Sequence, residues 1–145
     1  MSWTGGCQCG AVRFRVEGLG PAMICHCRMC QKATGGLFAP TADVTGLAWT
    51  RWRPAYFNSS NLARRGYCAD CGTPLSYEAD DYVNLMLGAF DDPAAIAPQL
   101  QVGLSGKLPY TDHLAGLRHR TAAEQAAVEP FFAKVLSNQH PDHDT

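Results

Sequence analysis

Seven cysteines constrain this 145-residue chain more than any other feature of its sequence. They fall into three clusters, Cys7-x-Cys9, Cys25-x-Cys27-x-x-Cys30 and Cys68-x-x-Cys71. An odd number of cysteines leaves one thiol over in any complete disulfide scheme. The opening stretch, MSWTGGCQCG, has neither the basic nor the apolar segment of a signal peptide, so we expect a cytoplasmic, reducing location where disulfides are rare. The cysteines therefore indicate metal binding or thiol chemistry.

The first and last clusters share a feature, since each ends in a Cys-Gly pair. Gly10 and Gly72 let the backbone turn through conformations that are closed to other residues and approach the sulfurs closely. Two such corners make a closed tetrahedral site with sulfurs about 2.3 Å from a zinc ion. We therefore predict a structural zinc, which contributes to folding, on Cys7, Cys9, Cys68 and Cys71. The alternative is four free, buried cysteines.

The middle cluster leaves three thiols for a second ion. In an extended chain alternate side chains point the same way, so Cys25 and Cys27 can face one ion while His26 faces away. Cys30 returns to the same ion by a turn. Three ligands and an open fourth position are typical of catalytic zinc sites. His26 is the alternative fourth ligand, but the geometry favours a packing role for it.

Charge gives a second reason to expect a thiol ligand at the middle cluster. Three thiolates and one zinc ion sum to −1, so a neutral thiol can enter as a fourth ligand and lose its proton there. Arg28 and Lys32 would then hold an anionic substrate near the metal. The alternative for these two residues is ordinary surface charge.

Composition indicates the number of domains and the kind of partner. Hydrophobic residues make up 46% of the chain and charged residues 17%, which suffices for the core of one domain. The formal net charge of −1 argues against nucleic acid, because phosphate binding usually needs a basic surplus. No basic segment points to a membrane surface, and the longest apolar runs are too short to span a bilayer. We expect small molecules as partners.

Short alternating segments predict a mainly β fold. In AVRFRVEG, Val12, Phe14 and Val16 lie on one side of an extended chain and the charged residues on the other. GLFAPTADV and LAWTRWRPAYF also read as extended, and PLSYEADDYVNLMLGAF reads as a hairpin with an acidic turn. DDPAAIAP is typical of one helical turn, with proline at its first position.

The C-terminal part predicts helix instead. Thr121 and Glu124 fit a capping box, and Pro130 predicts a kink or two consecutive short helices. The apolar residues that follow helical spacing are Val128, Phe131, Phe132, Val135 and Leu136. We expect this stripe to pack on the sheet, with a partner surface as the alternative. Residues 138–145 read as a flexible tail in which His140 and His143 are solvated.

The combination of motifs resembles the glutathione-dependent formaldehyde-activating enzyme family, whose domain also occurs in centromere protein V. The similar pieces are GGCQCGAVRF, CHCRMCQKATGGLF, YFNSSNLARRGYCADCGTPLSY and GAFDDP, in the family's order, over about residues 5 to 93. The resemblance implies a single domain, here residues 1–137, with a tent-like fold of zinc-ribbon character. It also implies the structural zinc proposed above and a second, labile zinc on Cys25, Cys27 and Cys30 that meets the thiol of glutathione.

The family reaction is the condensation of glutathione with formaldehyde to S-hydroxymethylglutathione, classed as a carbon–sulfur lyase running in reverse. In this reaction a thiolate attacks the carbonyl carbon, and the developing oxyanion needs a hydrogen-bond donor. Candidate donors are Ser59, Ser60 and the backbone N–H groups around Gly35 and Gly36. The alternative for the two serines is turn formation.

Three other functions are open from the sequence. The first is a non-catalytic zinc- or glutathione-binding module. The second is a thiol oxidoreductase that uses Cys27-x-x-Cys30, although no βαβ pattern surrounds this pair. The third is a protein in which only the four-cysteine site holds zinc.

Overall fold

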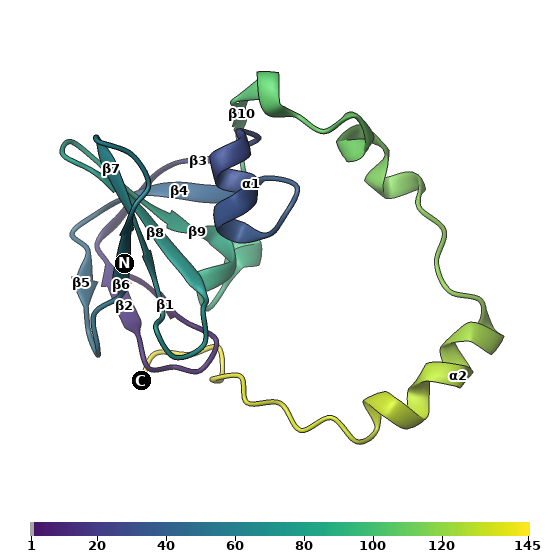
Figure 1. Cartoon of the computed structure of the whole chain (residues 1–145). Coiled ribbons are helices and arrows are strands. Elements are labelled where there is room, and N and C mark those ends of the chain that lie inside the picture. The colour runs from purple at the N-terminus through teal and green to yellow at the C-terminus, as the bar shows by residue number, and fades with distance from the viewer. Residues whose placement is uncertain (1) are drawn as a thin grey trace.

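A computed structural model describes residues 2–145, and they form a mainly β structure with two sheets, as predicted (Figure 1). The smaller sheet has the order β1 (Trp3–Gly6), β2 (Arg13–Val16) and β5 (Ala48–Trp49). The larger sheet has the order β10 (Leu100–Val102), β3 (Gly18–Cys25), β4 (Ala39–Thr45), β9 (Val83–Met86), β8 (Pro74–Ala79), β7 (Ala63–Tyr67) and β6 (Ala55–Asn58). Neighbouring strands are antiparallel except β10 and β3, which are parallel.

Helices occupy the connections and the C-terminal part. They are α1 (Arg28–Thr34), η1 (Leu87–Ala89), η2 (Pro93–Ala95), η3 (Leu104–Gly106), η4 (Pro109–Gly116) and α2 (Ala122–Phe132), the η elements being 3₁₀-helices. The predicted hairpin is present as β8 and β9, and the predicted helical turn is η2 with Pro93 at its first position. Within residues 2–145, no helix combines the length and apolar character needed to cross a membrane.

The core lies where the two sheets meet, and β2 supplies its centre. The alternation read from the sequence is confirmed, because Val12, Phe14 and Val16 are all buried. The ring of Phe14 packs edge-on against Trp49 of β5 and against Phe90, with centroids 6.1 and 5.1 Å apart. Phe90 also pairs with Gly5 through an isolated β-bridge, which ties η1 to the smaller sheet.

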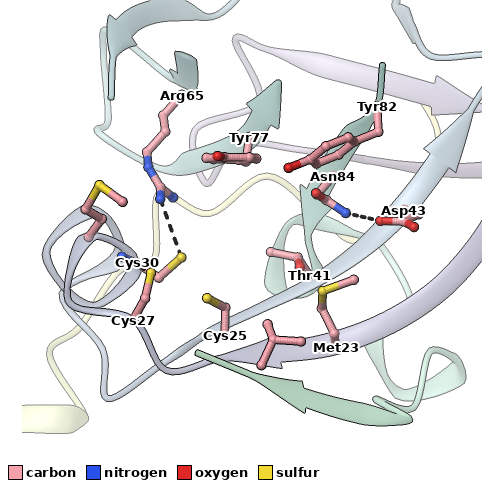
Figure 2. Close-up of a pocket in the computed structure, with 12 residues that line it drawn as sticks. Met23, Cys25, Cys27, Cys30, Thr41, Asp43, Arg65, Tyr77, Tyr82 and Asn84 are labelled. Atoms are coloured by element: carbon pink, nitrogen blue, oxygen red, sulfur yellow. Dashed lines mark hydrogen bonds between the residues drawn. The ribbon is translucent and has the colours of Figure 1, made fainter. Parts of the chain in front are cut away.

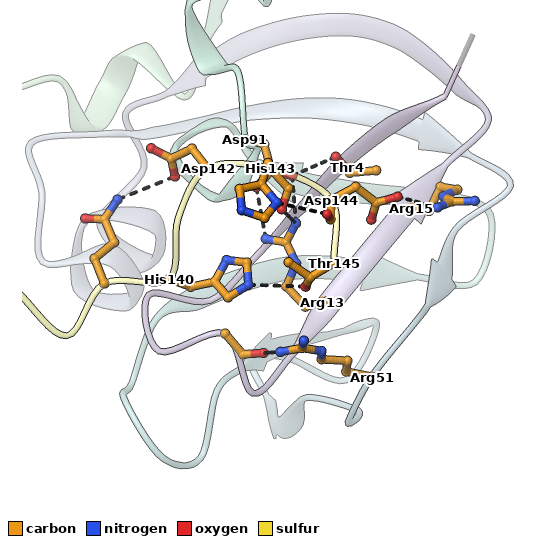
Figure 3. A network of polar contacts seen from close by, with 12 residues as sticks. Thr4, Arg13, Arg15, Arg51, Asp91, His140, Asp142, His143, Asp144 and Thr145 are labelled. Atoms are coloured by element: carbon orange, nitrogen blue, oxygen red, sulfur yellow. Dashed lines mark hydrogen bonds and ion pairs between the residues drawn. The ribbon is translucent and has the colours of Figure 1, made fainter.

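Arg13 departs from the pattern, because it lies on the polar side of β2 and is nevertheless buried. Its guanidinium donates two hydrogen bonds to Asp91, of 2.9 and 2.7 Å, and a third of 2.9 Å to the backbone carbonyl of His143 (Figure 3). Thr4 Oγ1 donates to the same carboxylate over 2.6 Å. Arg13 is therefore a buried cation that is neutralised by a residue 78 positions away in the sequence.

The last residues of the chain lie against the N-terminal strands. The backbone N–H of His140 donates to the carbonyl of Gln8 over 2.7 Å. Arg15 forms an ion pair with Asp144 (Figure 3). His143 is exposed, whereas His140 is half-buried.

The segment between η3 and the tail corrects two predictions. The apolar stripe does not pack on the sheet, because α2 has no buried residue and Phe131 is 69% exposed. Figure 1 shows α2 standing apart from both sheets before the chain returns to β1 and β2. Helical spacing defines an apolar face but does not determine what that face meets, which is why the sequence was misleading here.

The second correction concerns Pro130. A single helix continues through this residue and ends two residues later, at Phe132, so the alternative of two consecutive short helices is wrong. A proline in the last turn removes only one backbone hydrogen bond, which a helix that is about to end can tolerate. The capping box of Thr121 and Glu124 is confirmed, with both of its hydrogen bonds formed.

Phe14 and Phe131 provide a matched pair for testing where the core lies. We expect Phe14→Ala to lower the free energy of unfolding by about 3–5 kcal/mol, because it empties a fully buried site. Phe131→Ala should change it by no more than about 0.5 kcal/mol, because that side chain is largely exposed and its ring pairs with that of its neighbour Phe132. Denaturant unfolding of both variants measures this. A loss of several kcal/mol in Phe131→Ala would mean that α2 packs on the domain.

The Arg13–Asp91 pair should make stability depend on pH. Burial raises the pKa of Asp91, but the hydrogen bonds from Arg13 and Thr4 outweigh burial and hold this pKa below its usual value. A lowered folded-state pKa stabilises the protein at neutral pH, and the stabilisation is lost as pH falls through that pKa. We expect Asp91→Asn to cost about 3–5 kcal/mol at neutral pH, because it leaves a buried cation unpaired.

The difference between wild type and Asp91→Asn should begin to shrink as the pH falls below about 4, where the carboxylate becomes protonated in the unfolded chain. It should be smallest once the pH is below the lowered pKa of Asp91 in the folded protein. Urea unfolding at a series of pH values measures the difference. A difference that stays constant across this range would show that Asp91 acts through packing and not through its charge.

Candidate functional site

The predicted grouping of the seven cysteines is confirmed, and four of them form one group between two hairpin loops. Cys7 and Cys9 lie between β1 and β2, and Cys68 and Cys71 lie between β7 and β8. Their Sγ atoms all lie within 4.8 Å of one another, with 3.5 Å between Cys7 and Cys9 and 3.8 Å between Cys9 and Cys68. A tetrahedral zinc ion with bonds of about 2.3 Å separates its sulfurs by about 3.8 Å, so this group fits zinc.

The glycines after these cysteines have the predicted conformation. Gly10 has φ 81° and Gly72 has φ 77°, in the left-handed region, and their N–H groups donate to the carbonyls of Cys7 and Cys68. The N–H of Val12 donates to Cys7 Sγ over 3.2 Å, which is a contact that favours a thiolate. Burial nevertheless raises the pKa of Cys7 to about 12, so this sulfur needs a cation beside it to ionise.

The other three cysteines form a second group at the end of β3. Cys25 is the last residue of β3, Cys27 is the N-cap of α1 and Cys30 lies in the first turn of α1, where its N–H donates to Cys27 Sγ over 3.4 Å. Their Sγ atoms also lie within 4.8 Å of one another, and no further His, Cys, Asp or Glu of residues 2–145 joins them. The group therefore offers three ligands and leaves one side open.

That open side faces a pocket of about 370 Å³ (Figure 2). Met23, Met29 and Val102 form the apolar part of its lining. The polar residues that line it are Thr41, Asp43, Arg65, Tyr77, Tyr82 and Asn84. By contrast, the four-cysteine group offers four sulfurs, enough to occupy every corner of a tetrahedral metal ion. The structure thus distinguishes a closed site from one that opens onto a space of ligand size.

His26 lies outside the three-cysteine group, as predicted, and packs. It is 1% exposed, its Nε2 lies 2.7 Å from Oε1 of Gln101, and its ring meets Phe38 edge-on. The neighbouring residue Gln31 donates two hydrogen bonds of 2.9 Å, to the carbonyls of His26 and Gly106. These contacts position the loop that carries the cysteines.

The last residue of β10 and the glycine that follows it support the same loop, which the sequence did not reveal. Val102 accepts a hydrogen bond of 2.9 Å from the backbone N–H of His26. Gly103 has φ 65°, and a Cβ atom there would lie 2.9 Å from the backbone nitrogen of Cys27. A glycine is therefore required at position 103, but its role depends on a contact that sequence spacing does not encode.

Arg65 on β7 is the main functional residue that sequence reasoning missed. It is buried, and its Nη2 donates to Cys30 Sγ over 3.4 Å (Figure 2). Its Nε donates to Ser59 Oγ over 3.0 Å, and its guanidinium lies 4.8 Å from the centre of the Tyr77 ring. Burial raises the pKa of Cys30 to about 12, and the hydrogen bond from Arg65 opposes that rise. In the sequence Arg65 is one of two adjacent arginines with nothing to distinguish it.

The four predicted substrate contacts lie outside the cysteine pocket. Arg28, Lys32 and Ser59 line a separate depression, which Arg65 also borders. Ser60 Oγ accepts hydrogen bonds from the N–H groups of Leu62 and Ala63 in the turn between β6 and β7. Among the predicted backbone donors, Gly35 is the left-handed C-cap of α1 and is exposed.

Metal content provides the test of the two groups. We expect two zinc ions per wild-type chain and one in Cys30→Ser, because this variant removes a ligand from the open group and leaves the closed group intact. Met29→Leu is the matched control, since it changes a pocket residue in the same turn that is not a ligand, and it should retain two. Elemental analysis of the purified proteins measures this. One zinc ion in wild type and Cys30→Ser alike would show that the open group holds no metal.

Two comparisons with known proteins complete the description of the site. Among solved structures, a crystal structure of a Rhodobacter sphaeroides protein shares 21% sequence identity with a TM-score of 0.49, and the match covers 68% of this chain and 99% of that one. A family model described as "glutathione-dependent formaldehyde-activating enzyme" matches residues 2–105, a range that contains all seven cysteines and every residue of the pocket. The chain therefore belongs to the glutathione-dependent formaldehyde-activating enzyme family.

Proposed function

We propose that this protein adds the thiol of glutathione to formaldehyde, or to another small carbonyl compound, and forms an S-hydroxymethyl adduct. One observation carries the proposal: three cysteine sulfurs with an unfilled side face a pocket of about 370 Å³, while the other four form a closed group. The activity belongs to the carbon–sulfur lyase class, running in the direction of synthesis. Membership of the family supports glutathione and formaldehyde as the reactants.

Cys25, Cys27 and Cys30 are proposed as the ligands of the second zinc ion, and Cys7, Cys9, Cys68 and Cys71 as those of the structural zinc. A zinc ion at the open group would lower the pKa of a thiol that takes its free position and so supply a thiolate near neutral pH. The reducing, cytoplasmic location expected from the opening stretch of the sequence suits this chemistry, because it would keep these thiols and glutathione reduced.

The chain's own contribution to the reaction is positioning. Arg65 holds Cys30 through its Nη2 and is itself held by Ser59, so Ser59 acts as a positioning residue. Met23 and Val102 line the pocket with apolar side chains. Arg28 and Lys32, in the neighbouring depression, are proposed to attract an anionic thiol to the pocket.

The proposed step is an addition without oxidation or reduction. The thiolate sulfur forms a bond to the carbonyl carbon, the electron pair of the C=O π bond moves to oxygen, and that oxygen takes up a proton. Tyr77 and Tyr82 line the pocket and carry hydroxyl groups that can donate to the developing oxyanion. Ser60 is engaged in its turn, so we propose for it a structural role in holding the strand that carries Arg65.

Formaldehyde and glutathione combine without an enzyme, so the test compares rates with this background. We expect the wild-type protein to accelerate the exchange between free glutathione and its S-hydroxymethyl adduct, as followed by NMR exchange spectroscopy at equilibrium. Cys30→Ser should lower the acceleration by at least about 10-fold, because it removes a ligand of the open group. Phe131→Ala, which changes an exposed residue of α2, should match wild type.

Equal rates in the presence and absence of wild-type protein would contradict the proposed reaction. If glutathione still bound in that case, the protein would be a non-catalytic glutathione-binding module.

A further inference from the structure

The cysteine pocket has a second polar end, and strand register places it on the same face of the larger sheet. Arg65 on β7 is opposite Tyr77 on β8, Tyr77 is opposite Asn84 on β9, and Asn84 is opposite Asp43 on β4. Residues directly opposite one another in a sheet point to the same face, so these four side chains form one row across the pocket. Figure 2 shows Arg65 beside the cysteines and Asp43 at the far end of the row.

Asp43 is an acidic group without a cationic partner. Its carboxylate accepts a hydrogen bond from Asn84 Nδ2, and among residues 2–145 no Lys, Arg or His forms an ion pair with it. Asp43 is half-buried and Asn84 is buried. An anion in a partly apolar pocket is costly unless a cation or several donors neutralise it. The pocket thus offers a preformed site for a positively charged group.

Two features hold Asp43 in this position. Asn84 orients one carboxylate oxygen, and Gly20 on β3 leaves room for the side chain. A Cβ atom at position 20 would lie 2.9 Å from the Cβ of Asp43, so a larger residue there would push against it. The carboxylate is therefore oriented before any ligand arrives, which reduces the entropy lost on binding.

The distance between the cysteines and Asp43 restricts the length of a ligand that could contact both. Cys25 is opposite Ala39 on β4, and Asp43 lies four residues further along that strand. At the rise of a β-strand this is about 13 Å between Cα positions, before the side chains reach inward from both ends. A short aminothiol such as cysteamine is too small to reach both ends at once. A thiol whose ammonium group stands at the end of a longer arm, as in a γ-glutamyl peptide, has a suitable length.

We propose that Asp43, oriented by Asn84, binds the ammonium group of the thiol substrate and thereby selects γ-glutamyl thiols over thiols without an ammonium group. This inference deepens the proposed function and rests on it for the position of the sulfur. The charges of the pocket lining agree, because Arg65 is its one cation, already donating to Cys30 and Ser59, and Asp43 is its one carboxylate.

Calorimetric titrations of wild type and Asp43→Asn test the proposal with two probes, glutathione and N-acetylglutathione, which has the thiol but no ammonium group. We expect wild type to bind glutathione about 10- to 100-fold more tightly than N-acetylglutathione, the usual effect of a charged hydrogen bond. In Asp43→Asn the two dissociation constants should agree within about 3-fold. Asp92→Asn, which changes an exposed acid outside the pocket, should retain the wild-type preference.

Three results would overturn the proposal: equal affinities in wild type, a preference that survives Asp43→Asn, or no binding of either probe to wild type. Thermal unfolding of Asp43→Asn checks that the variant folds. A third probe, S-methylglutathione, separates this inference from the proposed reaction, because it keeps the ammonium group but has no free thiol to react. If its binding depends on Asp43 while wild type fails to accelerate adduct exchange, the ammonium site stands and the reaction is wrong.

Discussion

Four sulfur atoms, those of Cys7, Cys9, Cys68 and Cys71, meet between two hairpin loops that belong to different sheets. The rest of the structure depends on this contact, because it fixes the position of the smaller sheet against the larger one. That position determines which residues pack around Phe14 in the core. Burial keeps the pKa of Cys7 high, so this thiol is costly to ionise without a cation, and a metal ion there would couple binding to folding.

The four-cysteine group has no free side, whereas the three-cysteine group has one. Strands of the larger sheet supply residues that line the pocket on that side. The strand β3 delivers Cys25 to the pocket, and the first turn of α1 brings in Cys27 and Cys30. Arg65 and Asp43 then sit at opposite ends of one cross-strand row. The pocket has the three cysteines and the cation of Arg65 at one end and the carboxylate of Asp43 at the other. This arrangement suits a ligand that carries both a sulfur and a distant ammonium group.

The sequence predicted the parts of this arrangement that depend on the spacing of residues close together in the chain. The cysteine clusters with their glycines, the alternation of β2 and the capping box of Thr121 each involve residues close together in the chain, where geometry follows from spacing. Arg65 could not be predicted as a neighbour of Cys30, because that contact depends on the register of four strands. The burial of Arg13 likewise depends on Asp91 and on a tail that returns from the far end of the chain.

In the proposed function, the open three-cysteine group accepts the sulfur of glutathione as a fourth metal ligand. Substituting cobalt for zinc tests this directly, because sulfur-to-cobalt charge-transfer absorption rises with each thiolate bound to the metal. We expect glutathione to increase this absorption by about the contribution of one thiolate per chain, whereas S-methylglutathione, which cannot form a thiolate, should leave it unchanged. If glutathione does not alter the absorption of a protein that carries two cobalt ions, its sulfur is not a ligand of the open group.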